Sequence, residues 1–138
     1  MNVNDCRLIE LPRVNDPCGN LTFIESGRQI PFDIERIFYL YDVPGGATRA
    51  GHALKSCHQF LIASSGSFAV SVDDGSNKQT FQLNRSYYGL YVPPLIWIEI
   101  SNFSSGAICI VLASEFYSEE GYHRDYSDYL SAMRKLHE

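Results

Sequence analysis

The chain has 138 residues, of which 45% are hydrophobic and 20% charged, a composition typical of one globular domain spanning residues 1–138. Its net charge of −5, without any run of Lys or Arg, argues against a nucleic-acid-binding surface. No stretch approaches the ~18 apolar residues of a membrane span, and the N-terminal residues show no apolar leader. The four cysteines are scattered without a Cys-x-x-Cys pair, so we expect free thiols and a cytoplasmic location.

Short apolar runs alternate with turn signals along most of the chain, which predicts an all-β protein. The predicted strands are 21–25, 36–41, 50–54, 59–64, 66–73, 78–83, 89–92, 97–102 and 107–113. Turn segments such as Pro44-Gly45-Gly46 and Asp73-Asp74-Gly75 are typical of hairpins, and we assign the second no role beyond the turn. So many strands exceed one flat sheet, and the hairpins therefore predict an antiparallel barrel.

The C-terminal residues follow a different pattern. Tyr129, Leu130, Met133 and Leu136 recur at helical spacing, which predicts a short helix over 127–136. Ser127 or Asp128 could cap its N-terminus. We expect this helix to lie against the barrel.

The spacing of Gly46, His52, Gln59 and Gly66 is similar to the frame that shapes one strand pair in cupin-type barrels. In metal-dependent members, this frame and a later strand supply His and acidic or amide ligands. The corresponding positions here are His52, Leu54, Gln59 and Ile98. Leu and Ile offer no lone pair, and one imidazole with one amide falls short of the three or four ligands of Zn, Fe or Mn sites. We therefore expect a metal-free pocket without a cofactor.

Several stretches, in order along nearly the whole chain, carry a family resemblance. They are 36–44, 49–55, 72–75, 89–94, 97–99, 102–104, 111–114 and 122–126. Together they resemble the nucleotide-sugar 3,4-ketoisomerases, also called WxcM-like. The resemblance implies a cupin-like antiparallel β-barrel of the jelly-roll type and a homodimer with exchanged N-terminal strands. It also implies metal-free conversion of a dTDP-4-keto-6-deoxyhexose to its 3-keto isomer, in the biosynthesis of deoxy-amino sugars.

Such an isomerisation needs a base, an acid and groups that hold two oxygens. A proton leaves the carbon beside a ketone, an enediol forms, and a proton returns to the neighbouring carbon. A base with a pKa near the working pH favours His, and His52 lies where the frame points into the barrel. Tyr39 and Tyr41 are candidate partners in proton transfer, and Gln59 and Glu99 are candidates for binding the sugar, if their strands turn these side chains inward.

The diphosphate of a nucleotide sugar requires cations. Arg49 and Lys55 bracket His52 on the same predicted strand, and Arg offers bidentate geometry to phosphate. Both could instead be solvated charges at the barrel mouth. Arg36 is a further candidate for substrate binding, although it could simply cover a strand edge. Trp97 could stack on the nucleotide base, but a lone Trp is more often a core residue.

Three positions depart from the pattern of the family. The family motif His-Ala-His-Lys reads His52-Ala53-Leu54-Lys55 here, and an isobutyl group cannot accept a proton. Ile98 stands where the family commonly has His or Arg, and Cys18 stands where it commonly has Arg or Tyr. These replacements suggest a changed sugar or a changed stereochemical outcome.

Without the second His, three explanations remain open. His52 with a Tyr performs both steps, His58 has taken over the missing role, or the usual reaction is lost. The first two predict an isomerase that introduces solvent deuterium into the sugar ring. The third predicts a catalytically impaired nucleotide-sugar-binding protein that keeps the pocket. A metal-dependent epimerase or dioxygenase is disfavoured by the ligand count.

Overall fold

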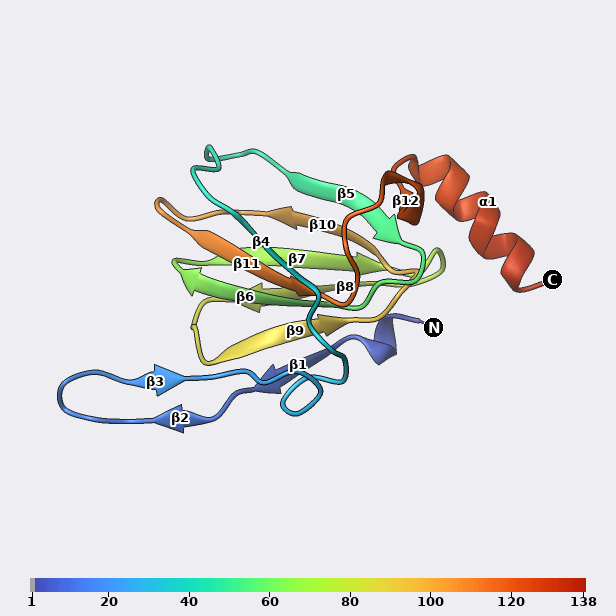
Figure 1. The fold of residues 1–138 in the computed structure, drawn as a ribbon. Helices are drawn as coiled ribbons and strands as arrows, with labels where there is room; N and C mark the ends of the chain where they lie inside the picture. Colours follow the sequence, from blue (N-terminus) through green and yellow to red (C-terminus); the bar gives the residue numbers. More distant parts are fainter. Residues whose placement is uncertain (1) are drawn as a thin grey trace.

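The computed structural model describes residues 2–138 and is mostly β-sheet with a C-terminal α-helix (Figure 1). The first sheet has the order β1 (Arg7–Glu10), β9 (Tyr88–Val92), β6 (Gln59–Ser65), β11 (Ile108–Ala113) and β4 (Arg36–Leu40). The second has the order β12 (Tyr122–His123), β5 (Arg49–Leu54), β10 (Trp97–Ser101), β7 (Phe68–Asp73) and β8 (Lys78–Leu83). A separate hairpin consists of β2 (Arg13–Val14) and β3 (Leu21–Thr22). All strand pairs are antiparallel.

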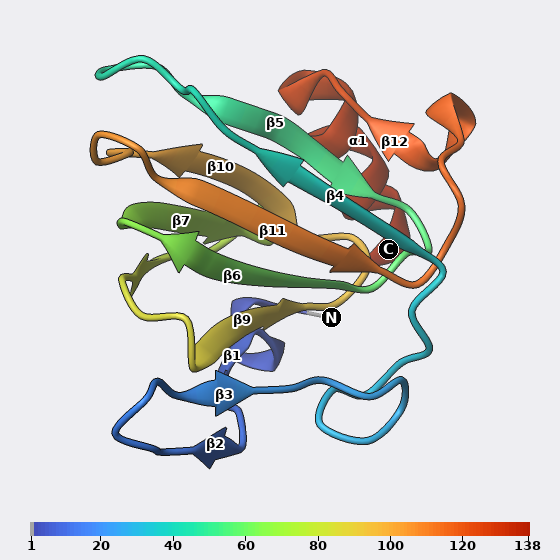
Figure 2. The ribbon, with the colours of Figure 1, turned by 60° about the vertical axis from the view of Figure 1, so that its left-hand side comes forward.

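The predicted all-β jelly roll with a C-terminal helix is confirmed, but the two sheets are not closed into a barrel. They pack face to face as a sandwich (Figure 2). The expectation of successive hairpins is largely wrong, because among described strands only β2–β3 and β7–β8 are neighbours both in sequence and in a sheet. The other connections between β4 and β11 cross from one sheet to the other. Turn residues reverse the chain in either case, so they could not reveal the pairing.

The main core lies between the two sheets. Leu61 and Leu90 from the first sheet pack with Val70, Val72 and Ile98 from the second, and all are almost fully buried. Burial of such side chains stabilises the fold by about 1.5–3 kcal/mol each. A second apolar cluster covers the outer face of the first sheet, so β6 is buried on both faces.

Gly89 permits the close approach of β9 to β6. A Cβ atom at this position would lie 2.5 Å from the Leu61 carbonyl oxygen and 2.5 Å from the Phe60 ring. Both neighbours belong to the buried centre of the sheet and cannot withdraw easily. The glycine is therefore required by packing, in a strand that is otherwise apolar.

Sequence patterns missed the shortest strands. β1, β2 and β12 were not predicted, and the predicted strand 21–25 is reduced to β3. These segments are two to four residues long and mostly exposed or half-buried, so they carry too few alternations to be recognised. The structure also contains two 3₁₀ turns, η1 (Val3–Asp5) and η2 (Glu119–Gly121).

The predicted C-terminal helix is present as α1 (Tyr126–Leu136). Its cap is Asp125, not Ser127 or Asp128, and the Asp125 carboxylate accepts a hydrogen bond of 2.9 Å from the Asp128 N–H. Tyr129 and Met133 pack the helix on Trp97 of the second sheet. None of the helices within residues 2–138 has the length and apolar character needed to cross a bilayer.

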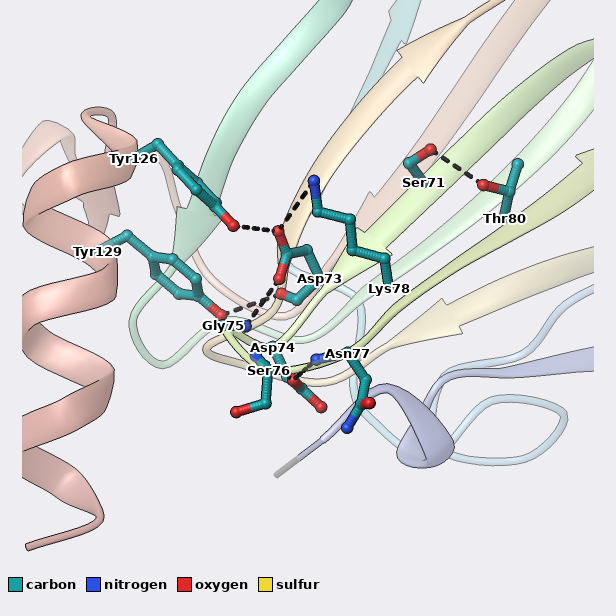
Figure 3. A network of polar contacts seen from close by, with 10 residues as sticks. All are labelled: Ser71, Asp73, Asp74, Gly75, Ser76, Asn77, Lys78, Thr80, Tyr126 and Tyr129. Atoms are coloured by element: carbon teal, nitrogen blue, oxygen red, sulfur yellow. Dashed lines mark hydrogen bonds and ion pairs between the residues drawn. The ribbon is translucent and has the colours of Figure 1, made fainter.

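The Asp73-Asp74-Gly75 turn does more than reverse the chain, which corrects our expectation. Asp73 is buried and its carboxylate accepts a hydrogen bond from the Tyr126 hydroxyl, with Lys78 Nζ at 3.9 Å (Figure 3). The Tyr129 hydroxyl donates to the Asp73 carbonyl oxygen at 3.0 Å. The turn therefore anchors the first two turns of α1 to the sandwich.

Asp74 anchors the N-terminus. Its carboxylate accepts hydrogen bonds from the backbone N–H groups of Val3, Ser76 and Asn77 at 2.8–2.9 Å. Burial acts to raise the pKa of Asp74, but these N–H groups stabilise the charged form, and the net pKa lies below its ordinary value of 3.8. A folded-state pKa below the unfolded one contributes stability above pH 4, which is lost as the pH falls through the folded value.

We expect Asp74→Asn to reduce the free energy of unfolding by about 1–3 kcal/mol at pH 7, because the amide leaves buried N–H groups unsatisfied. Urea denaturation measures the loss. The difference from the unsubstituted protein should shrink as the pH falls below 4. Asp42→Asn is the control, since Asp42 is exposed on the surface and its left-handed backbone accepts Asn. Equal stability of the two variants at pH 7 would contradict the anchoring role.

Candidate active site

A pocket of about 290 Å³ opens between the sheets. Its apolar walls come from β4, β5, β10 and β11, through Phe38, Leu40, Ala50, Ile98, Ile100 and Val111. Its polar groups are Thr48, Arg49, His52, Gln59, Tyr122 and Arg124. Apolar walls with a few converging polar groups are typical of small-molecule sites.

A β-bulge in β5 places Arg49, Ala50 and His52 around the same pocket. Ile98 of β10 pairs with His52, whereas the next residue pairs with Ala50, so Gly51 is the extra residue. Both Ala50 and Gly51 have positive φ, at 71° and 72°. Ala adopts this region at an energetic cost, and such strain often accompanies functional sites. The bulge breaks the simple alternation of faces and redirects the side chains before His52.

His52 is the one imidazole in the pocket. Its Nδ1 is buried and has no hydrogen-bond partner among residues 2–138. The ring meets Tyr122 edge to face, with 5.0 Å between centroids. The pKa of His52 is lowered from 6.5 to about 4, mainly by burial and to a smaller extent by the cations Arg124 and Arg36, with partial compensation by Glu119. The imidazole is therefore neutral at pH 7 and able to accept a proton.

Three segments bring guanidinium groups toward His52. Arg49 belongs to β5, and Arg124 follows β12. Arg36 of β4 donates a hydrogen bond of 3.3 Å from Nη2 to the Tyr122 hydroxyl, and its buried Nε lacks a partner among residues 2–138. A cationic pocket in a chain of net charge −5 indicates an anionic ligand.

A small network positions Arg124. Its guanidinium lies over the Tyr122 ring at 4.2 Å and donates from Nη2 to Glu119 at 3.0 Å. The Tyr117 hydroxyl also donates to Glu119. Hydrogen bonds from Arg124 and Tyr117 hold the pKa of Glu119 below its ordinary value. The carboxylate thus keeps Arg124 beside Tyr122.

Sequence reasoning missed Tyr122 and Arg124 as site residues. They lie far from His52 in sequence and reach it through the two-residue strand β12, in which Tyr122 pairs with Leu54 of β5. The stretch 122–126 belongs to the family resemblance, and that was the available signal. Its brevity and polar character suggested only a tail.

The structure brings four predicted site residues together. His52, Arg49 and Gln59 line the pocket, and Arg36 reaches it through Tyr122. Gln59 is only 1% exposed, which makes its amide a fixed polar group of the wall. Of the three departures from the family, Ile98 lines the pocket beside His52.

The other two departures lie elsewhere. Leu54 is buried against Cys57, Ala113 and Tyr122. Cys18 is exposed in the loop between β2 and β3, outside the pocket lining.

Five other predicted site residues lie outside this pocket. Tyr39 and Tyr41 are 59% and 61% exposed, because β4 turns Phe38 and Leu40 inward instead, so the expectation of an inward face is wrong for both.

Trp97 and Glu99 lie on the outer face of β10. There Trp97 packs against Tyr126 and Tyr129, with centroids 5.2 and 5.5 Å away. Trp97 is therefore a packing residue, which is the role that we weighed against stacking on the nucleotide base. Lys55 follows β5 as an exposed residue outside the pocket lining.

His58 does not replace the missing histidine in this pocket. It stacks on Phe32 and Tyr91, which belong to the cluster outside the first sheet. Its Nδ1 shares a hydrogen bond of 2.7 Å with the Tyr91 hydroxyl. The ring is therefore engaged on the opposite face from the pocket.

Metal-ligating side chains do not cluster in the part of the chain that the structure describes. No group of three or more His, Cys, Asp or Glu residues within 2–138 is placed to hold a metal ion. In the pocket, His52 stands beside the amide of Gln59 and arginines, whose positive charge opposes a cation. The donor set fits an anionic organic ligand better than a metal.

Fold and site together define a jelly-roll protein with a proton-accepting imidazole in a cationic pocket. The chain matches, over residues 4–134, the family model described as FdtA: WxcM-like, C-terminal. It is 37% identical over 130 residues to a TDP-4-oxo-6-deoxy-alpha-D-glucose-3,4-oxoisomerase of Aneurinibacillus thermoaerophilus, covering 94% of each chain. The chain therefore belongs to the WxcM-like FdtA family.

Solved structures agree with this assignment. The sugar 3,4-ketoisomerase QdtA from Thermoanaerobacterium thermosaccharolyticum, in complex with TDP, superposes with a TM-score of 0.92 at 37% identity, covering 95% of this chain and 96% of that one. The TDP-quinovose 3,4-ketoisomerase WlaRB from Campylobacter jejuni has a TM-score of 0.88 at 38% identity, covering 92% and 98%. The family relationship thus extends over nearly the entire chain.

We expect the His52 imidazole of the ligand-free protein to titrate near pH 4, well below 6.5. Arg124→Met should raise this pKa, because it removes one of two cations that disfavour the imidazolium. The rise should be partial, since burial is the larger cause. Long-range ¹⁵N–¹H NMR across a pH series measures it, with exposed Arg28→Met as the control. A pKa of 6.5 or above in the unsubstituted protein would contradict this account of the pocket.

Proposed function

We propose that this protein is a TDP-sugar 3,4-ketoisomerase that moves the keto group of a TDP-4-keto-6-deoxyhexose from C4 to C3. The observation that carries the proposal is the neutral, buried His52 imidazole between guanidinium groups in the pocket. Members of the same family act on TDP-linked 4-oxo sugars. The pocket contains the two kinds of group that such a substrate requires. These are a base to remove a proton from a sugar carbon and cations to bind the diphosphate.

In this proposal His52 removes the proton from C3 and returns it to C4. A neutral imidazole accepts that proton, and the resulting imidazolium donates it to the adjacent carbon. Arg124 and Arg36 lower the pKa of His52 in the free protein. Because a diphosphate bound to Arg124 offsets one of these two charges, we expect substrate binding to raise the proton affinity of His52.

Arg49 and Arg124 are the proposed diphosphate ligands, because both guanidinium groups line the pocket. We assign the Gln59 amide, a buried polar group of the pocket wall, to a sugar oxygen. A role for Trp97 in base stacking is not supported, since α1 covers its outer face. Lys55 and Glu99 lie outside the lining and are assigned no contact with the sugar.

The reaction is a redox-neutral transfer of protons, for which acid and base groups suffice. Its product carries a ketone at C3, the carbonyl that an aminotransferase requires to install an amino group. We therefore place the protein in deoxy-amino-sugar biosynthesis. A cytoplasmic location suits its unpaired cysteines, Cys6, Cys18, Cys57 and Cys109.

We expect purified protein incubated in D₂O with TDP-4-keto-6-deoxyglucose to form a 3-keto product with deuterium in the ring, followed by NMR. This compound is the ligand bound to a histidine-to-asparagine mutant of QdtA. His52→Asn should reduce turnover about 10²–10⁴-fold, the usual contribution of a general base. Binding of TDP without any deuteration by the unsubstituted protein would support a binding module and overturn the isomerase.

We further propose that the protein is a homodimer formed through its N-terminal region. The β2–β3 hairpin reaches beyond the body of the sandwich (Figure 1). Its residues Val14 and Leu21 are exposed. Both side chains are 55% exposed, an unusual position for aliphatic residues on a projecting arm. A second subunit would cover them.

We expect size-exclusion chromatography with light scattering to give twice the chain mass of 15.6 kDa. The double variant Val14→Asp/Leu21→Asp should shift the protein to monomer, because it places charges in the buried interface. Leu136→Asp serves as the control, since Leu136 is similarly exposed at the opposite end of the chain. A monomeric mass for the unsubstituted protein would contradict the dimer.

A further inference from the structure

The proposed reaction moves two protons, and His52 accounts for one. Besides the proton that passes from C3 to C4, a proton must leave O3 and another must reach O4. Leu54, which stands where the family motif has a second His, has no group that could assist. This inference rests on the proposed ketoisomerase function, which requires a side chain that exchanges protons with the two sugar oxygens.

Tyr122 occupies the required place. It pairs directly with Leu54 across β12 and β5 and packs against it. Its ring meets His52 edge to face at 5.0 Å, and the residue lines the pocket. The Tyr122 ring thus stands next to the proposed base, beside the position where the family histidine is missing.

Two arginine side chains contact Tyr122. The Arg36 guanidinium lies 3.3 Å from its oxygen, and Arg124 lies 4.2 Å from the centre of its ring. One guanidinium group thus contacts the phenol oxygen, and another contacts the face of its ring. The Arg36 Nε atom is buried and lacks a partner among residues 2–138, so a donor remains available on the same group.

Other candidate groups are engaged elsewhere. Tyr39 and Tyr41 face outward from β4. The Tyr117 hydroxyl donates to Glu119, and His58 is bonded to Tyr91 on the far face of the first sheet. Tyr122 is the phenol that the described residues present beside His52 in the pocket.

We propose that Tyr122 is a catalytic residue that exchanges protons with the two sugar oxygens while His52 exchanges protons with the two carbons. As His52 removes the C3 proton, the C3–H electron pair forms the C3=C4 bond. The C4=O π pair takes the Tyr122 phenolic proton, which yields the enediol and a phenolate.

The second half reverses these roles at the neighbouring atoms. The phenolate takes the proton from the O3 hydroxyl, and that O–H electron pair forms the C3=O bond. The C3=C4 pair takes the proton from the His52 imidazolium at C4. Both side chains regain their starting protonation states, and no oxidant or reductant is consumed.

Tyr122→Phe tests this assignment, because it removes one oxygen and keeps the ring against Leu54, His52 and Arg124. With TDP-4-keto-6-deoxyglucose we expect kcat to fall about 10²-fold or more, the scale of general acid–base catalysis. TDP affinity, measured by calorimetry, and the thermal unfolding midpoint should remain unchanged. Tyr87→Phe is the matched control, since Tyr87 lies before β9, outside the pocket lining.

The outcomes separate this inference from the proposed function. Product from the unsubstituted protein and from Tyr122→Phe at similar rates overturns the role of Tyr122 alone. Parallel loss of kcat and TDP affinity in Tyr122→Phe also overturns it, because the hydroxyl would then act in binding. Absence of product and deuteration with the unsubstituted protein overturns the ketoisomerase and, with it, the role of Tyr122.

Discussion

The candidate site depends on how the C-terminal segment is held against β5. β12 adds two residues to the edge of the second sheet, and α1 follows at once. The hydroxyls of Tyr126 and Tyr129 fix that helix to Asp73, the last residue of β7. A two-residue strand contributes little pairing energy on its own, so the buried hydrogen bonds of the helix hold it in place. Tyr122 and Arg124 reach His52 only because of this anchor.

Within the pocket, electrostatics sets the chemistry. His52 is kept neutral by burial and by nearby guanidinium groups, and these same groups attract an anionic ligand. Binding of a diphosphate would therefore do two things together: hold the substrate and restore proton affinity to the imidazole. Glu119 moderates the charge of Arg124 from the rim, where solvent screens the pair.

In the proposed mechanism, Tyr122 takes over a role next to Leu54, where the family motif has a histidine. Seen in the sequence, an isobutyl group in a histidine motif suggests a defective enzyme. In the fold, Leu54 packs against the ring of Tyr122, and it supports the side chain that carries the hydroxyl. An apolar residue is well suited to this place, because it fixes an aromatic neighbour by contact without competing for its hydrogen bonds.

The sequence by itself determined most of the strands, the C-terminal helix, and the presence of His52 and Gln59 in one pocket, although their strands lie in different sheets and do not pair. These features follow local rules: alternation of period two, helical spacing and turn residues. Membership of the family also followed from stretches along nearly the whole chain, and the comparisons confirm it.

Only the tertiary structure decided which face of each strand meets the pocket. Alternation shows that Phe38 and Leu40 share one face and that Tyr39 shares the other with Ile37, but both faces of β4 are hydrophobic, so the pattern cannot choose. The bulge at Gly51 escaped notice because one extra residue leaves no mark in composition. The contact between His52 and Tyr122 also lay beyond the sequence, since it arises where distant segments are brought together by burial and backbone pairing.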